Sequence, residues 1–251
     1  MQIKLALSLL APTLLLVAAP PAPFTYSQDF NGMRDGTSAP DGWTVYAISG
    51  SHDRFKPLDD TLGIGGLPTG DDIKGGSEQE VLIPATPDTS ASQKGRSGFN
   101  WAIGGSATER SLGTSPSGVA AVVLELKLTN GGPATKHLDV AYDVRVLSTT
   151  VVGNKGYATS GYDGIEELPG YRLYYSLDNG ATYTNIASLN SDGHQWPNTI
   201  RTVHLAAPDV ALNGSWNANA VLFLRWVDDN AQSPSPDQKL GLDNLTIRAL
   251  P

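Results

Sequence analysis

The chain has 251 residues, a formal net charge of −8 at neutral pH and no cysteine. The absence of cysteine excludes disulfide cross-links and thiol chemistry. The acidic balance, without any cluster of lysine or arginine, argues against binding to nucleic acid or to an anionic membrane.

Residues 1–19 have the pattern of a secretory signal peptide. Lys4 precedes an apolar stretch, and the small residues Val17 and Ala19 precede the expected cleavage site. The apolar stretch contains Pro12 and is shorter than a segment that spans a bilayer comfortably, and an uncleaved anchor is the alternative. We therefore expect a secreted protein, extracellular or at the cell surface, with no membrane span after signal removal. The lack of cysteine favours a bacterial source.

Candidate strands follow one another along the rest of the chain, and no segment shows a sustained helical stripe. The clearest is 138–147, where Leu138, Val140 and Tyr142 alternate with Asp139 and Asp143. Similar patterns cover residues 24–30, 43–48, 119–128, 171–176, 184–189, 199–205, 221–228 and 242–248. The sequence predicts an all-β fold, an antiparallel β-sandwich (jelly roll) with long loop insertions, forming a single domain over residues 24–251.

Turn residues separate several of these strands. Asn-Gly pairs occur in residues 129–132 (TNGG) and 178–180 (DNG), and such pairs supply the positive φ angles of tight hairpins. Both segments therefore predict antiparallel pairing of the strands that flank them. Residues 49–118 and 155–169 are rich in loop-forming residues, and we expect them to be long insertions.

Two strands near the C-terminus each carry a carboxylate among apolar residues. Residues two apart share a face of a strand, which puts Asp228 with Leu224 and Trp226, and Asp243 with Leu245. A carboxylate in apolar surroundings must be paired, hydrogen-bonded or bound to a metal.

Calcium is one partner for these carboxylates, because it takes six to eight oxygen ligands. One hypothesis is a structural Ca²⁺ held by Asp228, Asp243 and Asp29, provided that the two ends of the domain meet. The alternative is that protein donors satisfy the carboxylates, either backbone N–H groups or the side chains of Arg225 and Arg110.

Four aromatic residues in or near loops are candidate ligand-binding residues: Trp101, Tyr157, Tyr162 and Trp196. An exposed ring can stack on a sugar while nearby polar groups bind the hydroxyls. The alternative is that these rings fill the ends of the sandwich.

Catalytic signatures are weak. The chain has no Gly-x-Ser-x-Gly nucleophile elbow, and its four histidines are scattered. The acidic pair Glu166 and Glu167 has no spacing that fixes two carboxylates about a glycosidic bond. We therefore expect that the protein is not an enzyme.

Several segments together resemble a set of bacterial secreted jelly-roll domains. They are residues 26–32 (YSQDFNG), 40–43 (PDGW), 100–104 (NWAIG), 109–113 (ERSLG), 174–183 (YYSLDNGATY), 224–226 (LRW) and 241–245 (GLDNL). The same opening and closing segments are found in MAM domains and in concanavalin A-like (laminin G-like) sandwiches. The resemblance implies binding of glycans or other surface partners, and a structural cation near the termini. Asn244 departs from the pattern, which often has a second aspartate there.

The sequence favours a secreted, non-catalytic β-sandwich that binds a glycan or another surface component such as a protein, with a structural calcium ion. Two alternatives stay open. One is a self-associating structural protein of the cell envelope or extracellular matrix. The other is a glycan hydrolase or lyase of concanavalin A-like fold.

Overall fold

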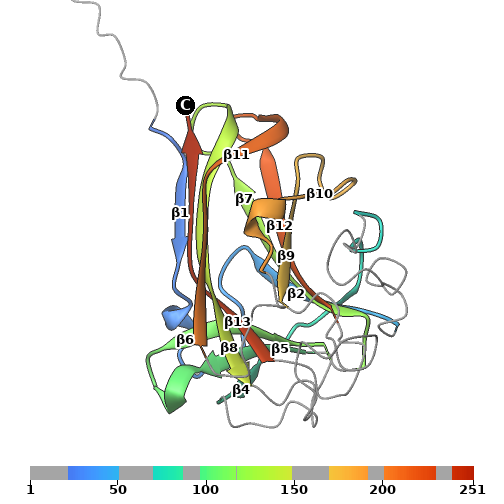
Figure 1. Cartoon of the computed structure of the whole chain (residues 1–251), viewed down its shortest axis with the longest axis vertical. Coiled ribbons are helices and arrows are strands. Elements are labelled where there is room, and N and C mark those ends of the chain that lie inside the picture. Colours follow the sequence, from blue (N-terminus) through green and yellow to red (C-terminus); the bar gives the residue numbers. More distant parts are fainter. Residues whose placement is uncertain are drawn as a thin grey trace, which may run out of the picture.

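Two β-sheets packed face to face form the protein (Figure 1). The computed structural model describes residues 22–50, 70–86, 97–116, 118–148, 170–191, 201–229 and 239–251. The predicted signal peptide lies outside these residues. The all-β sandwich predicted from the strand patterns is confirmed, and its two sheets fit a jelly-roll-like arrangement.

The larger sheet has seven strands in the order β11-β8-β13-β6-β5-β4, and β1 pairs with β13 beside this path. Neighbouring strands run antiparallel, apart from the parallel pair β4 and β5. The strands are β1 (Thr25–Gln28), β4 (Ile83–Ala85), β5 (Ser97–Ala102), β6 (Arg110–Ser115), β8 (Thr135–Ser148), β11 (Arg201–Trp216) and β13 (Lys239–Leu250).

The smaller sheet has six strands in the order β10-β9-β12-β7-β2-β3, all antiparallel. They are β2 (Trp43–Ile48), β3 (Ser77–Glu78), β7 (Ala121–Thr129), β9 (Tyr171–Ser176), β10 (Thr184–Asn185) and β12 (Val221–Asp229). Three short 3-10 turns complete the described elements: η1 (Asn31–Met33), η4 (Ile103–Gly105) and η6 (Ala187–Leu189).

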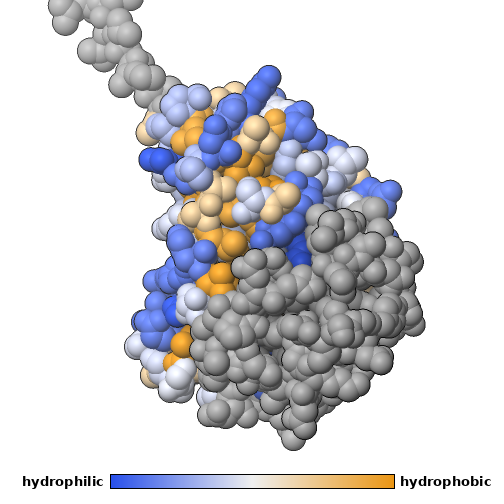
Figure 2. Space-filling view, viewed as in Figure 1, coloured by the Kyte–Doolittle hydropathy of each residue, from blue (hydrophilic) through white to orange (hydrophobic). Residues whose placement is uncertain are grey.

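The main core fills the space between the sheets. Strand β8 shows how it forms, because Leu138, Val140 and Tyr142 are fully buried in this core while Asp139 and Asp143 alternate to the opposite, outer face of the sheet. Figure 2 shows a band of hydrophobic residues between the two sheets, with hydrophilic residues over the flank nearest β1. The alternation predicted for this strand is therefore confirmed.

The prediction that residues 49–118 are loop is wrong in part, because this stretch contains β3, β4, β5 and β6. Strand β5 is buried along almost its whole length, and β6 along all of it, so their outward residues need not be polar. The outward positions of β6 carry small residues, Ser111 and Gly113 among them. Such strands lack the apolar–polar alternation that a sequence pattern detects.

The two predicted hairpin turns have different outcomes. The turn at 178–180 joins the antiparallel strands β9 and β10, with positive φ at Asn179 (59°) and Gly180 (78°), as predicted. Hydrogen bonds donated by Thr182 and Ser176 lower the pKa of Asp178 to about 2.

The segment 129–132 instead connects β7 to β8, which belong to different sheets. The hairpin predicted there is wrong.

Candidate functional site

Asp228 lies on the inner face of β12 and contacts the opposite sheet. It accepts a hydrogen bond from the Thr114 hydroxyl of β6, and that hydroxyl lies 3.0 Å from the hydroxyl of Tyr171. Burial, with the Asp228 charge as a second cause, raises the pKa of Tyr171 well above its usual value. Asp228 is therefore part of a polar contact between the two sheets, inside the core.

Asp243 lies on the outer face of the larger sheet, opposite to the face predicted for it. The register of β13 against β8 shifts between Asp243 and Thr246, and Asn244 there adopts a left-handed φ of 48°. The extra residue of this bulge reverses the alternation, so Leu245 points into the core while Asp243 does not.

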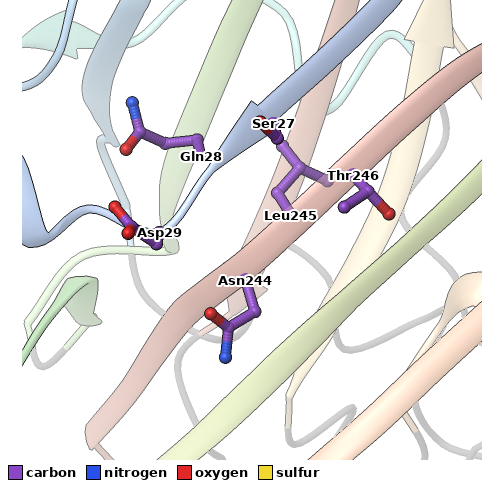
Figure 3. A pocket seen from close by; sticks show the side chains of 6 residues that line it. All are labelled: Ser27, Gln28, Asp29, Asn244, Leu245 and Thr246. Atoms are coloured by element: carbon purple, nitrogen blue, oxygen red, sulfur yellow. The ribbon is translucent and has the colours of Figure 1, made fainter.

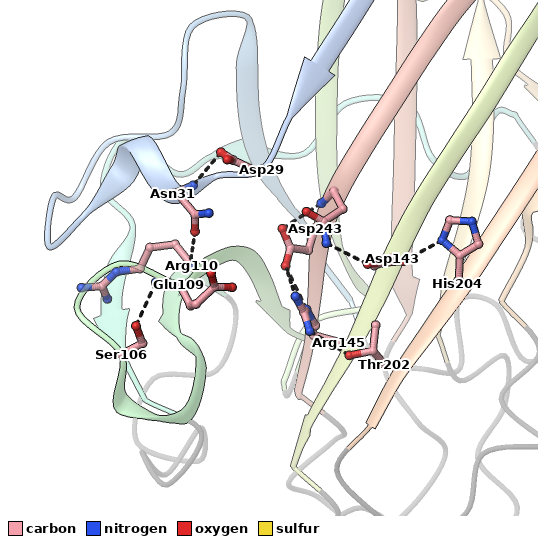
Figure 4. Close-up of polar contacts among 11 residues, drawn as sticks. Asp29, Asn31, Ser106, Glu109, Arg110, Asp143, Arg145, Thr202, His204 and Asp243 are labelled. Carbon is pink, nitrogen blue, oxygen red and sulfur yellow. Dashed lines mark hydrogen bonds and ion pairs between the residues drawn. The ribbon is translucent and has the colours of Figure 1, made fainter.

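An arginine of the neighbouring strand holds Asp243 in place (Figure 4). Arg145 Nε and Nη2 lie 2.9 and 2.7 Å from Asp243 Oδ2, and the backbone N–H of Asn244 donates to Oδ1 at 2.7 Å. Burial raises the pKa of Asp243, although the hydrogen bonds and charge of Arg145 act to lower it. Both carboxylate oxygens therefore already have protein donors.

The three carboxylates predicted to bind calcium do not come together. Asp228 lies in the core on the smaller sheet, and Asp243 lies on the outer face of the larger one. Asp29 follows β1 and accepts the N–H of Asn31 at 3.1 Å. Within the described ranges, no three His, Cys, Asp or Glu residues form a group that could hold a metal ion. The described residues therefore do not fit the predicted calcium site.

We expect the melting temperature of the protein to be the same in millimolar calcium and in chelator. Asp243→Asn should lower the free energy of unfolding by about 1–3 kcal/mol in both buffers, because Arg145 loses a charged acceptor. Thermal unfolding with and without calcium measures this, with Asp29→Asn as the control for a more exposed carboxylate. A calcium-dependent rise in the wild type that Asp243→Asn removes would restore the metal prediction.

Trp101, predicted to bind ligand, is fully buried on β5. Its ring stacks on Phe99 with 4.5 Å between centroids, and Lys239 Nζ lies 5.6 Å from its centroid. The ring is therefore a packing element and offers no exposed face to a sugar. Tyr157, Tyr162 and Trp196 lie outside the described residues.

A strip of small side chains crosses the outer face of the larger sheet. It follows the strand pairings Ser27 with Thr246, Thr246 with Ala141, and Ala141 with Ala206. The strip therefore runs across β1, β13, β8 and β11, roughly perpendicular to the strands. We call these four residues the strip.

Two rows of longer polar side chains flank the strip. On one side Arg248 Nη2 lies 2.8 Å from Asp139 Oδ2, which joins β13 to β8. On the other side Asp143 accepts a hydrogen bond from Asn244 Nδ2 at 2.8 Å, and its second oxygen lies 2.8 Å from His204 Nδ1. The second row thereby joins β13, β8 and β11. The strip and its two rows form what we call the trough.

Two shallow hollows lie at the β1 end of the trough and share the residues Ser27 and Thr246. One, of about 290 Å³, extends to Asp29 and Asn244, both of which Figure 3 shows beside the strip residues. The other, of about 350 Å³, extends to Asp139 and Arg248. The trough is therefore hollowed on both sides of the Ser27–Thr246 pair.

Apart from Asp29, the residues that the trough brings together were not predicted from the sequence to belong to a site. Asp29, predicted as a calcium ligand, and Asn244 line the same hollow. The outward position of Asp139 and Asp143 follows from the alternation of β8. Their meeting with Arg248 and His204 depends on strand order and register, which no local pattern in the sequence reveals.

The trough offers hydrogen-bond donors and acceptors in fixed positions. Carboxylates accept, the Arg248 guanidinium donates, and Asn244 and His204 can do both. Such a set suits a ligand that is rich in hydroxyl groups, because each hydroxyl donates and accepts.

None of the helical turns in the described part of the chain has the length and apolar character needed to cross a bilayer.

The chain matches no protein-family model and no curated protein. Twenty-four chains of solved structures match it. One is TmCBM61 in complex with beta-1,4-galactotriose, with 10% sequence identity and a TM-score of 0.26 over 57% of this chain and 72% of that chain. At these values the likeness carries no argument about ligand or site.

Proposed function

We propose that this protein is a secreted, non-catalytic β-sandwich that binds a glycan in the trough. The observation that carries the proposal is the strip of small residues between two rows of polar side chains that already hold one another. Side chains fixed in this way lose little conformational freedom on binding, which favours affinity. Their position on paired strands also keeps them rigid.

The same residues support a binding role over a catalytic one. Asp143 is engaged by both Asn244 and His204, and Asp139 is engaged by Arg248. His204 has an orienting carboxylate, yet no hydroxyl of the described residues is hydrogen-bonded to its second nitrogen. A nucleophile–base pair requires such a contact.

We also propose, from the segments quoted above, a relationship to MAM and concanavalin A-like domains.

Binding and turnover by the mature protein test this function. The protein should be retained by at least one immobilised polysaccharide and should release no reducing ends from any of them. Steady product release that Glu166→Gln or Glu167→Gln abolishes would instead support the hydrolase alternative. Retention by none, with self-association on size-exclusion chromatography, would support the structural alternative.

A further inference from the structure

The charges that line the trough are unbalanced. Asp29, Asp139 and Asp143 contribute three carboxylates, and Arg248 contributes one guanidinium. Arg145 lies next along β8, but its guanidinium is bound to Asp243. The trough is therefore negative, like the chain as a whole with its net charge of −8.

A ligand that carries carboxylate or sulfate groups would place its negative charges beside the carboxylates of the trough. Placing like charges side by side costs several kcal/mol in an interface. The field of an acidic protein also slows the approach of an anionic ligand. A neutral ligand avoids both penalties and still offers hydroxyl groups to the carboxylates and to the donors.

The dimensions of the trough suit a single chain that lies across the strands. The strip crosses four strands, or three spacings, which gives a length of roughly 14 Å. Asp139 and Asp143 are four residues apart along β8, so the two rows stand roughly 13 Å apart. A chain that follows the strip would have one polar row along each side.

We infer that the trough takes a neutral glycan chain lying along the strip, and that it excludes glycans bearing carboxylate or sulfate groups. This inference rests on the proposed function and names the ligand class of that same site. Specificity arises because Asp29, Asp139 and Asp143 accept hydrogen bonds from sugar hydroxyls and repel anionic substituents.

The test compares neutral polysaccharides with anionic counterparts of the same backbone, such as methyl-esterified and de-esterified polygalacturonate, or native and sulfated forms of neutral glucans, mannans and galactans. We expect binding to be confined to neutral members. Their affinity should change little between low salt and about 0.5 M NaCl, because the ligand has no charge to screen. Equal or tighter binding of an anionic member overturns the inference while leaving glycan binding intact.

Variants of the strip locate the binding. Ala141→Trp should weaken binding by at least about 100-fold, equivalent to roughly 2.8 kcal/mol, because an indole would occupy the strip. Ala206→Trp, at an exposed position of the strip, is a second variant in case the first disturbs the fold. Ala211→Trp, also exposed on β11 but outside the strip, is the control and should bind like the wild type.

The outcomes separate the two claims. If glycan binding survives both strip variants, the trough is not the site. This inference and the proposed location of the site then fail, whereas glycan binding by the protein stands. If no glycan of either class is bound by the folded wild type, the proposed function fails, and the inference fails with it.

Discussion

Glu125→Ala is expected to lower the free energy of unfolding by about 3–5 kcal/mol, because it leaves the Arg225 charge buried without its carboxylate. The two side chains are 9% and 8% exposed, and Arg225 Nε lies 2.5 Å from Glu125 Oε2. Arg225 also lies over the rings of Tyr46 and Tyr183, at 5.1 and 4.9 Å from their centroids, and donates to the carbonyl oxygen of Ile73. For a chain of this length, the loss corresponds to a fall in melting temperature on the order of 10 °C.

Thermal unfolding of matched variants measures this effect. Asp71→Ala breaks the ion pair with Lys74, in which Asp71 is 86% exposed, and should change stability by about 0–1 kcal/mol. Glu125→Leu combined with Arg225→Met removes both buried charges and should recover much of the loss. Equal losses of stability in Glu125→Ala and Asp71→Ala would show that burial of the Glu125–Arg225 pair does not increase the cost of breaking it.

Gly113→Ala is expected to destabilise the protein by about 3 kcal/mol, at the upper end of the usual cost of overpacking. A Cβ at Gly113 would lie 1.6 Å from Cδ1 and 1.8 Å from Nε1 of Trp101, whose ring lies against this glycine. The Trp101 ring is fully buried and would have to leave its position.

Chemical denaturation of three variants tests this packing. Gly131→Ala is the control, because a Cβ there meets no atom within 4 Å, and it should change stability by about 0.5 kcal/mol or less. In a Trp101→Ala background, Gly113→Ala should add little further loss, since the atoms that it would strike are gone. If the stability losses of the two substitutions are fully additive, the Cβ at position 113 does not clash with the Trp101 ring.

Strand alternation predicted the sandwich because inward and outward residues follow a period of two. The prediction for Asp243 was wrong because one extra residue at Asn244 reverses that period. The nearest glycine, Gly241, lies outside this bulge and pairs in regular register with Gly113 and Arg145, so it does not mark the bulge in the sequence. Arg225, considered from the sequence as a donor to Asp228 or Asp243, instead forms an ion pair with Glu125. Their strands are neighbours, so the two residues lie directly opposite.

The prediction at 129–132 was wrong for a different reason. Asn130 is buried and donates to the carbonyl oxygens of Pro133 and Trp216, both at 2.9 Å. The side chain of this asparagine thus fixes a connection between the two sheets. In a hairpin, an asparagine is favoured because its backbone readily adopts a positive φ angle. A short pattern such as Asn-Gly cannot distinguish these two uses.

The trough lay beyond sequence reasoning because its residues come from four strands spread from Ser27 to Arg248. Their meeting depends on the strand order β1-β13-β8-β11 and on the register of each pair. The sequence does show that Asp139 and Asp143 face outward on one strand. It does not show that Arg248 and His204 are their partners.

Titration of the ¹⁵N-labelled mature protein with a bound neutral oligosaccharide, followed by amide NMR shifts, tests the location of the binding site most directly. The largest changes are expected at the amides of Ser27, Ala141, Ala206 and Thr246, with smaller changes at Asp139 and Asp143. Saturating binding that leaves these amides unshifted, with the changes gathered elsewhere on the molecule, would contradict the assignment of the trough as the glycan-binding site.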